Sequence, residues 1–78
     1  MEVEKWLVDW FSDKLDCSAK EIDINVDFFE EEYIDSLKIF ELIMEIEYNF
    51  NIKFNNNDFL DKRVHSISGL INLINSKQ

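Results

Sequence analysis

The sequence predicts an all-α fold with three main helices, one short helix and a long first loop. Three segments, near residues 2–15, 35–50 and 66–74, carry apolar residues at helical spacing, which places them on one face of a helix. The only strand-like alternation, at Ile22, Ile24 and Val26, has no partner, and a lone strand is not stable. With 78 residues, 46% of them apolar, we expect a single domain over residues 1–78 with one core.

The first helix is expected to run from Glu2 to about Leu15. Its apolar residues follow i, i+3, i+4, i+7 and i+8 spacing: Val3, Trp6, Leu7, Trp10 and Phe11. Glu2 and Lys14 suit the positive N-terminal end and the negative C-terminal end of this helix. We expect both tryptophans to anchor the core.

A long connection follows, from Asp16 to Ile34. Ser18 and Glu21 have the spacing of a capping box, so we expect a short helical turn there. Loops of this length need apolar contacts with the rest of the domain or have a function. The candidates for such contacts are Ile22, Ile24, Val26, Phe28 and Phe29.

The second helix is the best defined. Asp35 is a good N-cap, and residues 36–50 contain no glycine or proline to break the helix. One narrow sector of this helix is apolar and should face the core: Ile39, Leu42, Ile43, Ile46 and Phe50. Asn51 is a plausible left-handed residue after its end.

A second apolar stripe lies almost opposite the first. It consists of Leu37, Met44 and Tyr48, with Glu41 among them. Because one helix in a small bundle cannot bury two opposite faces, we expect this stripe to be an exposed docking surface; the alternative is ordinary surface apolar residues. Residues 27–48 hold eight acids and one base, Lys38, so the surface is acidic. The expected docking residues are Leu37, Glu41, Met44, Glu45, Glu47 and Tyr48.

The last third of the chain should hold the short helix and the third main helix. Residues 55–57 are expected to form a turn, and Asn57 or Asp58 to cap a short helix that carries Phe59 and Leu60. Ser66 should cap the last helix, with Leu73 at the edge of its apolar stripe and a frayed tail over residues 76–78. That stripe comprises Ile67, Leu70, Ile71 and Ile74.

The net charge of −9 excludes direct nucleic-acid binding as a favoured function, because phosphates would be repelled. Partners with basic patches are implied instead, and their association should be sensitive to salt. The single cysteine, Cys17, cannot form an internal disulfide. Without a membrane-spanning run or a signal peptide, we expect a cytoplasmic monomer with no stable membrane insertion.

Ser36 is the candidate site. A hydroxyl in the first turn of a helix lies where the helix dipole and free N–H groups favour an anion. A nucleophilic triad of Asp35, Ser36 and His65 is disfavoured, because Asp35 serves as the cap and no nucleophile elbow is present. The acids at 30–32 have no His or Cys at ligand spacing, so they are read as solvated charge and no metal site is expected.

These residues resemble an acyl carrier protein. The resemblance rests on residues 28–37, which read FFEEEYIDSL, and on the helix behind them, and it extends from Trp6 to about Ile74. In that family the serine of the D-S-L motif, here Asp35-Ser36-Leu37, carries 4′-phosphopantetheine. The resemblance implies a four-helix bundle that is not an enzyme. It also implies that Leu42, Ile46 and Phe59 are candidates to line an acyl cavity.

The same resemblance implies the partners. A phosphopantetheinyl transferase would use coenzyme A and Mg²⁺ to esterify Ser36, and the arm would hold an acyl or aminoacyl group as a thioester. A loading enzyme and an acceptor transferase with basic docking patches would act on that thioester, in fatty-acid or secondary-metabolite biosynthesis.

Two alternatives to a general acyl carrier stay open. Residues 29–36 are similar to the Phe-Glu-Glu-Gly-Leu-(Leu/Val)-Asp-Ser run of D-alanyl carrier proteins of teichoic-acid modification, with Glu32 in place of glycine. Fatty-acid carriers usually have Leu-Gly where Glu32 and Tyr33 stand here, and peptidyl carriers have Gly-Gly before the residue preceding the serine. The last alternative is an acidic helical interaction module that is never modified.

Overall fold

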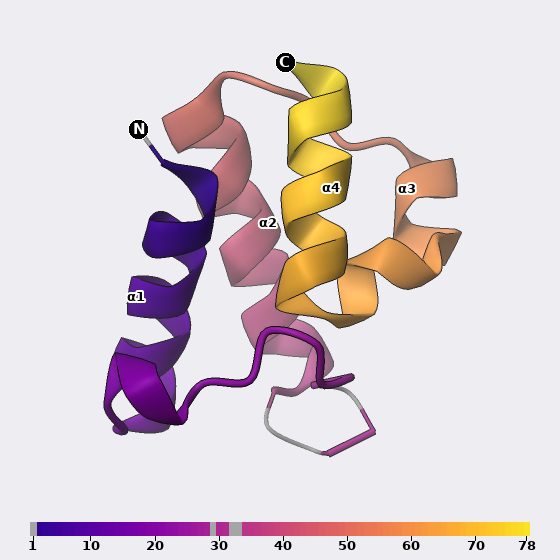
Figure 1. The fold of residues 1–78 in the computed structure, drawn as a ribbon. Coiled ribbons are helices and arrows are strands. Elements are labelled where there is room, and N and C mark those ends of the chain that lie inside the picture. The colour runs from indigo at the N-terminus through magenta and orange to yellow at the C-terminus, as the bar shows by residue number, and fades with distance from the viewer. Residues whose placement is uncertain (1, 29, 32–33) are drawn as a thin grey trace.

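In the computed structural model, which describes residues 2–28, 30–31 and 34–78, three long helices pack side by side. They are α1 (Val3–Leu15), α2 (Ser36–Phe50) and α4 (Ile67–Lys77). α1 runs opposite to α2 and α4, as Figure 1 shows. The shorter elements are η1 (Ala19–Glu21), α3 (Asn56–Leu60) and η2 (Lys62–His65). The predicted all-α fold is confirmed.

The three long helices share one apolar core. Every predicted core residue of α2 is buried, and so are Leu7, Trp10 and Phe11 of α1. Trp6 differs from the expectation, because it is only partly buried at the margin of the core. There its ring meets Phe50 edge-on, with the centroids 5.5 Å apart.

The long connection is fastened to the start of α4. We call residues 22–28 the strap. The backbone N–H of Ser68 donates to the carbonyl of Ile24 at 2.8 Å, and that of Phe28 donates to the carbonyl of His65 at 2.9 Å. Phe28 is buried with its ring 5.0 Å from that of Phe11, so apolar contact holds the strap as predicted. The predicted contact at Phe29 lies outside the described residues.

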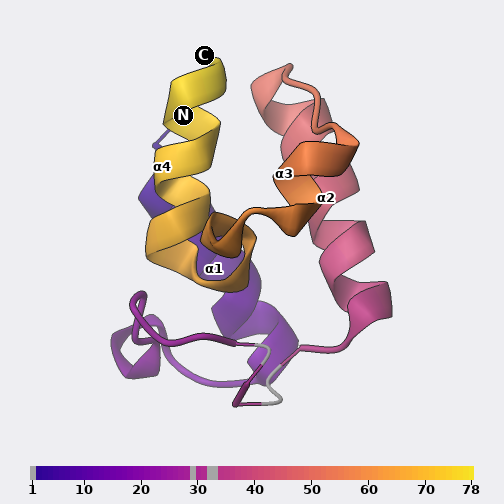
Figure 2. The same ribbon diagram turned by 90° about the vertical axis from the view of Figure 1, so that its right-hand side faces the viewer.

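The C-terminal ends of α1 and α2 are each followed by a residue with left-handed backbone conformation. Asn51 follows α2 with φ 55°, as predicted, and Asp16 follows α1 with φ 54°. Asp and Asn tolerate this conformation better than most non-glycine residues. In Figure 2, α3 lies in front of α2, and the connection between these two helices runs near the top of the molecule.

The predicted start of α3 is wrong. Its N-cap is Asn55, not Asn57 or Asp58, because Asn55 and Asp58 form a reciprocal capping box. Lys77 Nζ lies 2.7 Å from Asp58 Oδ2, which keeps α4 helical through Lys77 instead of frayed. Burial raises the pKa of the Asp58 carboxyl, but the hydrogen bonds from Lys77 and from the N–H of Asn55 outweigh it, so this pKa lies below its usual value.

α4 packs with the predicted face, because Ile67, Leu70 and Ile74 are buried, but the buried face extends further than expected on the Leu73 side. Leu73 is buried and Ile71 is only partly buried. The single glycine, Gly69, explains how close this helix comes to η2. A Cβ at Gly69 would lie 2.3 Å from the backbone oxygen of Arg63, so only glycine fits without a shift of the backbone.

Candidate functional site

The N-terminal end of α2 presents Ser36 to solvent. Asp35 caps the helix as predicted: its Oδ1 accepts the backbone N–H of Lys38 at 2.9 Å. The helical ladder begins with the N–H of Ile39, which donates to the carbonyl of Asp35 at 3.1 Å. The N–H groups of Ser36 and Leu37 come before that first bond, and such groups have no partner within the helix.

This geometry favours an anion attached at Ser36. The side chain is exposed, so an enzyme can reach the hydroxyl. The positive end of the helix dipole and the leading N–H groups stabilise negative charge there. The residues therefore fit a phosphate ester at Ser36, which is the position that the sequence singled out.

The outer face of α2 is apolar and exposed, as predicted. Leu37 is 70% exposed, Met44 62% and Tyr48 87%. Sequence analysis missed Phe40, which is 53% exposed and lies on the helix between Leu37 and Met44. Phe40 is three residues after Leu37 and four residues before Met44, and this helical spacing would have placed it on the same face. We call these four residues the outer stripe.

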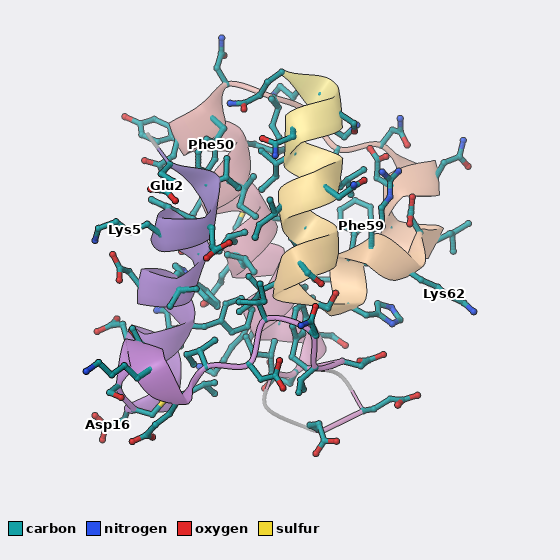
Figure 3. The ribbon with its side chains drawn as sticks, in the orientation of Figure 1. Glu2, Lys5, Asp16, Phe50, Phe59 and Lys62 are labelled. Atoms are coloured by element: carbon teal, nitrogen blue, oxygen red, sulfur yellow. The ribbon has the colours of Figure 1, made fainter. Side chains whose placement is uncertain are left out.

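Phe40 joins the outer stripe to α3. Its ring lies 5.8 Å from that of Phe59, which lies 6.3 Å from Phe54. Phe59, labelled on α3 in Figure 3, is at the surface. Leu42 and Ile46 are fully buried in the core, and the suggested role of these two residues and Phe59 in lining an acyl cavity stays a prediction. One cavity of the described residues, between α1, the strap and α4, is lined by other residues.

Two of the three expected docking acids have structural partners. Glu45 accepts the indole N–H of Trp10 at 2.7 Å, and Glu47 accepts the backbone N–H of Phe54 at 2.8 Å. These bonds tie α2 to α1 and to the connection before α3. Glu41 is exposed beside the outer stripe, so among these acids it is the one whose charge is best placed for a partner.

The other residues considered in the sequence analysis are not seen to contribute to a site at Ser36. His65 Nδ1 lies 3.5 Å from Asp27 Oδ2, so the histidine of the disfavoured triad pairs with a different acid. Within residues 2–28, 30–31 and 34–78, no three His, Cys, Asp or Glu side chains are grouped to hold a metal. Glu32 and Tyr33, which distinguish the carrier subfamilies, lie outside the described residues.

Comparison with known proteins points to the same serine-bearing region. A family model described as "Phosphopantetheine attachment site" matches residues 5–74, nearly the whole chain. No solved structure matches the chain. None of the described helices is long and apolar enough to cross a membrane.

Proposed function

Because this chain belongs to the phosphopantetheine attachment-site family of carrier proteins, we propose that it carries an acyl or aminoacyl group on an arm attached to Ser36. Members of the family are carriers and not catalysts, and their cofactor is a covalent 4′-phosphopantetheine. The observation that carries the proposal is the exposed Ser36 hydroxyl at the capped start of α2.

The surrounding residues suit this attachment. Asp35 fixes the first turn of α2 through its bond to the N–H of Lys38, so Ser36 is held at a helix start of defined geometry. The leading N–H groups stabilise the phosphodiester. The arm, when bound, supplies a terminal thiol that holds the cargo as a thioester. The chain positions the arm and provides a surface for partner enzymes.

We propose that the outer stripe and Glu41 form that surface. The stripe is apolar and exposed, and exposed apolar patches of this kind mark interaction sites. The chain has a net charge of −9, which favours partners with basic patches and accelerates their encounter at low salt. The partners are a phosphopantetheinyl transferase, a loading enzyme and an acceptor transferase. The docking roles of Glu45 and Glu47, the monomeric state and the cytoplasmic location stay predictions.

The cargo has two candidates. A general acyl carrier of fatty-acid or secondary-metabolite biosynthesis is the first. A D-alanyl carrier is the second, and it is supported by Phe29-Glu30-Glu31 and Asp35-Ser36, which match the D-alanyl run. Loading the modified protein with an aminoacyl-activating ligase and D-alanine, in parallel with an acyltransferase and acyl-coenzyme A, distinguishes the two by the mass of the thioester.

The direct test of attachment is intact mass after incubation with coenzyme A, Mg²⁺ and a broad-specificity phosphopantetheinyl transferase. We expect the wild type to gain one phosphopantetheine and Ser36→Ala to gain none while keeping its helical circular dichroism. If the folded wild type gains nothing while a control carrier is modified, the chain is an unmodified interaction module. If Ser36→Ala is still modified, the attachment site is elsewhere.

A matched pair of charge reversals tests the docking surface. Glu41→Lys should lower the transferase kcat/KM, because the introduced charge repels a basic patch. Glu4→Lys makes the same change on α1, at the end of the bundle away from Ser36, and should have little effect. The deficit of Glu41→Lys should shrink as salt is raised, since exposed charges are screened. Equal effects of both substitutions would contradict the proposed surface.

A further inference from the structure

The structure contains a cavity whose lining includes neither Ser36 nor any residue of the outer stripe. Its volume is about 340 Å³, toward the lower end of the range of about 300–1,000 Å³ for small-molecule pockets. It lies between the C-terminal half of α1, the strap and the start of α4. Asp16, labelled in Figure 3, lies just beyond the end of α1 and marks this part of the molecule.

The wall of the cavity is apolar. Six side chains from three separate segments form it: Phe11, Leu15, Ile22, Val26, Phe28 and Ile67. Such a wall offers few hydrogen-bond partners, so water gains little by filling it. A hollow of this volume equals the space of about eleven liquid water molecules at about 30 Å³ each, which accommodates an aliphatic chain of about eight carbons.

The polar residues of the cavity indicate which head group would suit a ligand whose aliphatic chain fills it. The polar residues among those that line it are Glu21, Asp23 and Cys17. Glu21 and Asp23 are exposed, so they lie at the mouth. Asp23 uses one oxygen, Oδ1, for the backbone N–H of Asn25 at 2.9 Å, which leaves its second oxygen for a ligand. None of the lining residues is Lys, Arg or His, so a ligand carboxylate would be repelled and an ammonium group attracted.

We infer that this cavity binds a small aliphatic amine, with the alkyl chain inside and the ammonium group between Glu21 and Asp23. This site is separate from Ser36 and does not depend on modification there. Charge complementarity at the mouth distinguishes the amine from a fatty acid and from a neutral alcohol of the same length.

The alkylation rate of Cys17 can report on binding, because this residue lines the cavity and is partly buried. The rate at which the neutral reagent iodoacetamide alkylates Cys17 is measured with octylammonium, octan-1-ol or octanoate at submicellar concentration and constant ionic strength. Methyl NMR shifts of Ile22, Val26 and Ile67 give a second readout that does not use the thiol. We expect octylammonium to protect Cys17 and shift these methyls most strongly, octan-1-ol less, and octanoate not at all.

A matched pair of double variants tests the ammonium site. Glu21→Gln/Asp23→Asn should weaken octylammonium binding about three- to tenfold, the loss expected for two exposed charge contacts. Glu30→Gln/Glu31→Gln removes the same net charge away from the cavity and should leave binding unchanged.

The inference is overturned if none of the three compounds protects Cys17 or shifts the methyl groups. It is also overturned if octanoate or octan-1-ol binds as tightly as octylammonium. Equal weakening by the two double variants would show that overall charge, and not the mouth of the cavity, attracts the amine.

Discussion

Truncation of Met44 separates docking from stability. A fully buried methionine side chain contributes about 1.5–3 kcal/mol, but Met44 is 62% exposed. Little more than a third of that contribution is at stake, so Met44→Ala should lower the free energy of unfolding by at most about 1 kcal/mol. The higher helix propensity of alanine offsets part of this loss. Leu42, two residues earlier and fully buried, gives the contrast, since Leu42→Ala should cost about 2–5 kcal/mol.

The exposed part of Met44 sets the expected loss in docking. If a partner covers this surface, Met44→Ala removes about 1–2 kcal/mol of apolar burial, which corresponds to about a five- to thirtyfold lower kcat/KM for the transferase. Urea unfolding followed by circular dichroism and transferase kinetics on the same preparations give both quantities.

Two results would refute this reasoning. A loss of stability in Met44→Ala as large as that in Leu42→Ala would mean that Met44 belongs to the core. Unchanged modification kinetics with unchanged stability would mean that the transferase docks on another face of the carrier.

Two further predictions concern stability. Gly69→Ala should lower the free energy of unfolding by up to about 2 kcal/mol. The added Cβ would meet the backbone oxygen of Arg63, and overpacking costs about 1–3 kcal/mol against a helix-propensity gain of about 1 kcal/mol. Thermal unfolding should show a lower Tm for this variant, while the exposed control Asn75→Ala on α4 raises it; a more stable Gly69→Ala would contradict the close contact. Asp58→Ala should lower the free energy of unfolding by about 1 kcal/mol at pH 7. Because the pKa of Asp58 is lowered in the folded state, its carboxylate stabilises the fold above the unfolded pKa of about 3.9. This stabilisation is lost as the pH falls through the folded pKa. Urea titrations should therefore show the gap to wild type closing below about pH 4, and a gap independent of pH would contradict the role of the Lys77–Asp58 pair.

Local signals predicted α2 because they agree with one another. The cap at Asp35, the absence of glycine and proline, the apolar stripe and the left-handed Asn51 all set the same bounds, and the structure has them. For α3 the local signals were ambiguous, because Asn55, Asn57 and Asp58 are all good capping residues. The pairing of Asn55 with Asp58 at the three-residue spacing of a capping box decided between them.

Features that depend on distant packing could not be predicted from the sequence. On a helical wheel Ile71 lies closer than Leu73 to the centre of the α4 stripe, yet the neighbours of α4 bury Leu73 more completely. The exposure of Phe40 follows from its spacing to Leu37 and Met44, but its contact with the ring of Phe59 does not, because Phe59 comes from another helix. The cavity brings together α1, the strap and α4, so no single stretch of sequence indicates it.

The directions of the helices have a practical consequence for experiments on this carrier. Both chain termini lie at one end of the bundle, and the start of α2 with Ser36 lies at the other, as both ribbon views show. A dye, an affinity tag or a surface linker joined to either terminus therefore projects away from the attachment serine. The protein can be immobilised or labelled by either end, and its modification by a partner enzyme can be followed one molecule at a time.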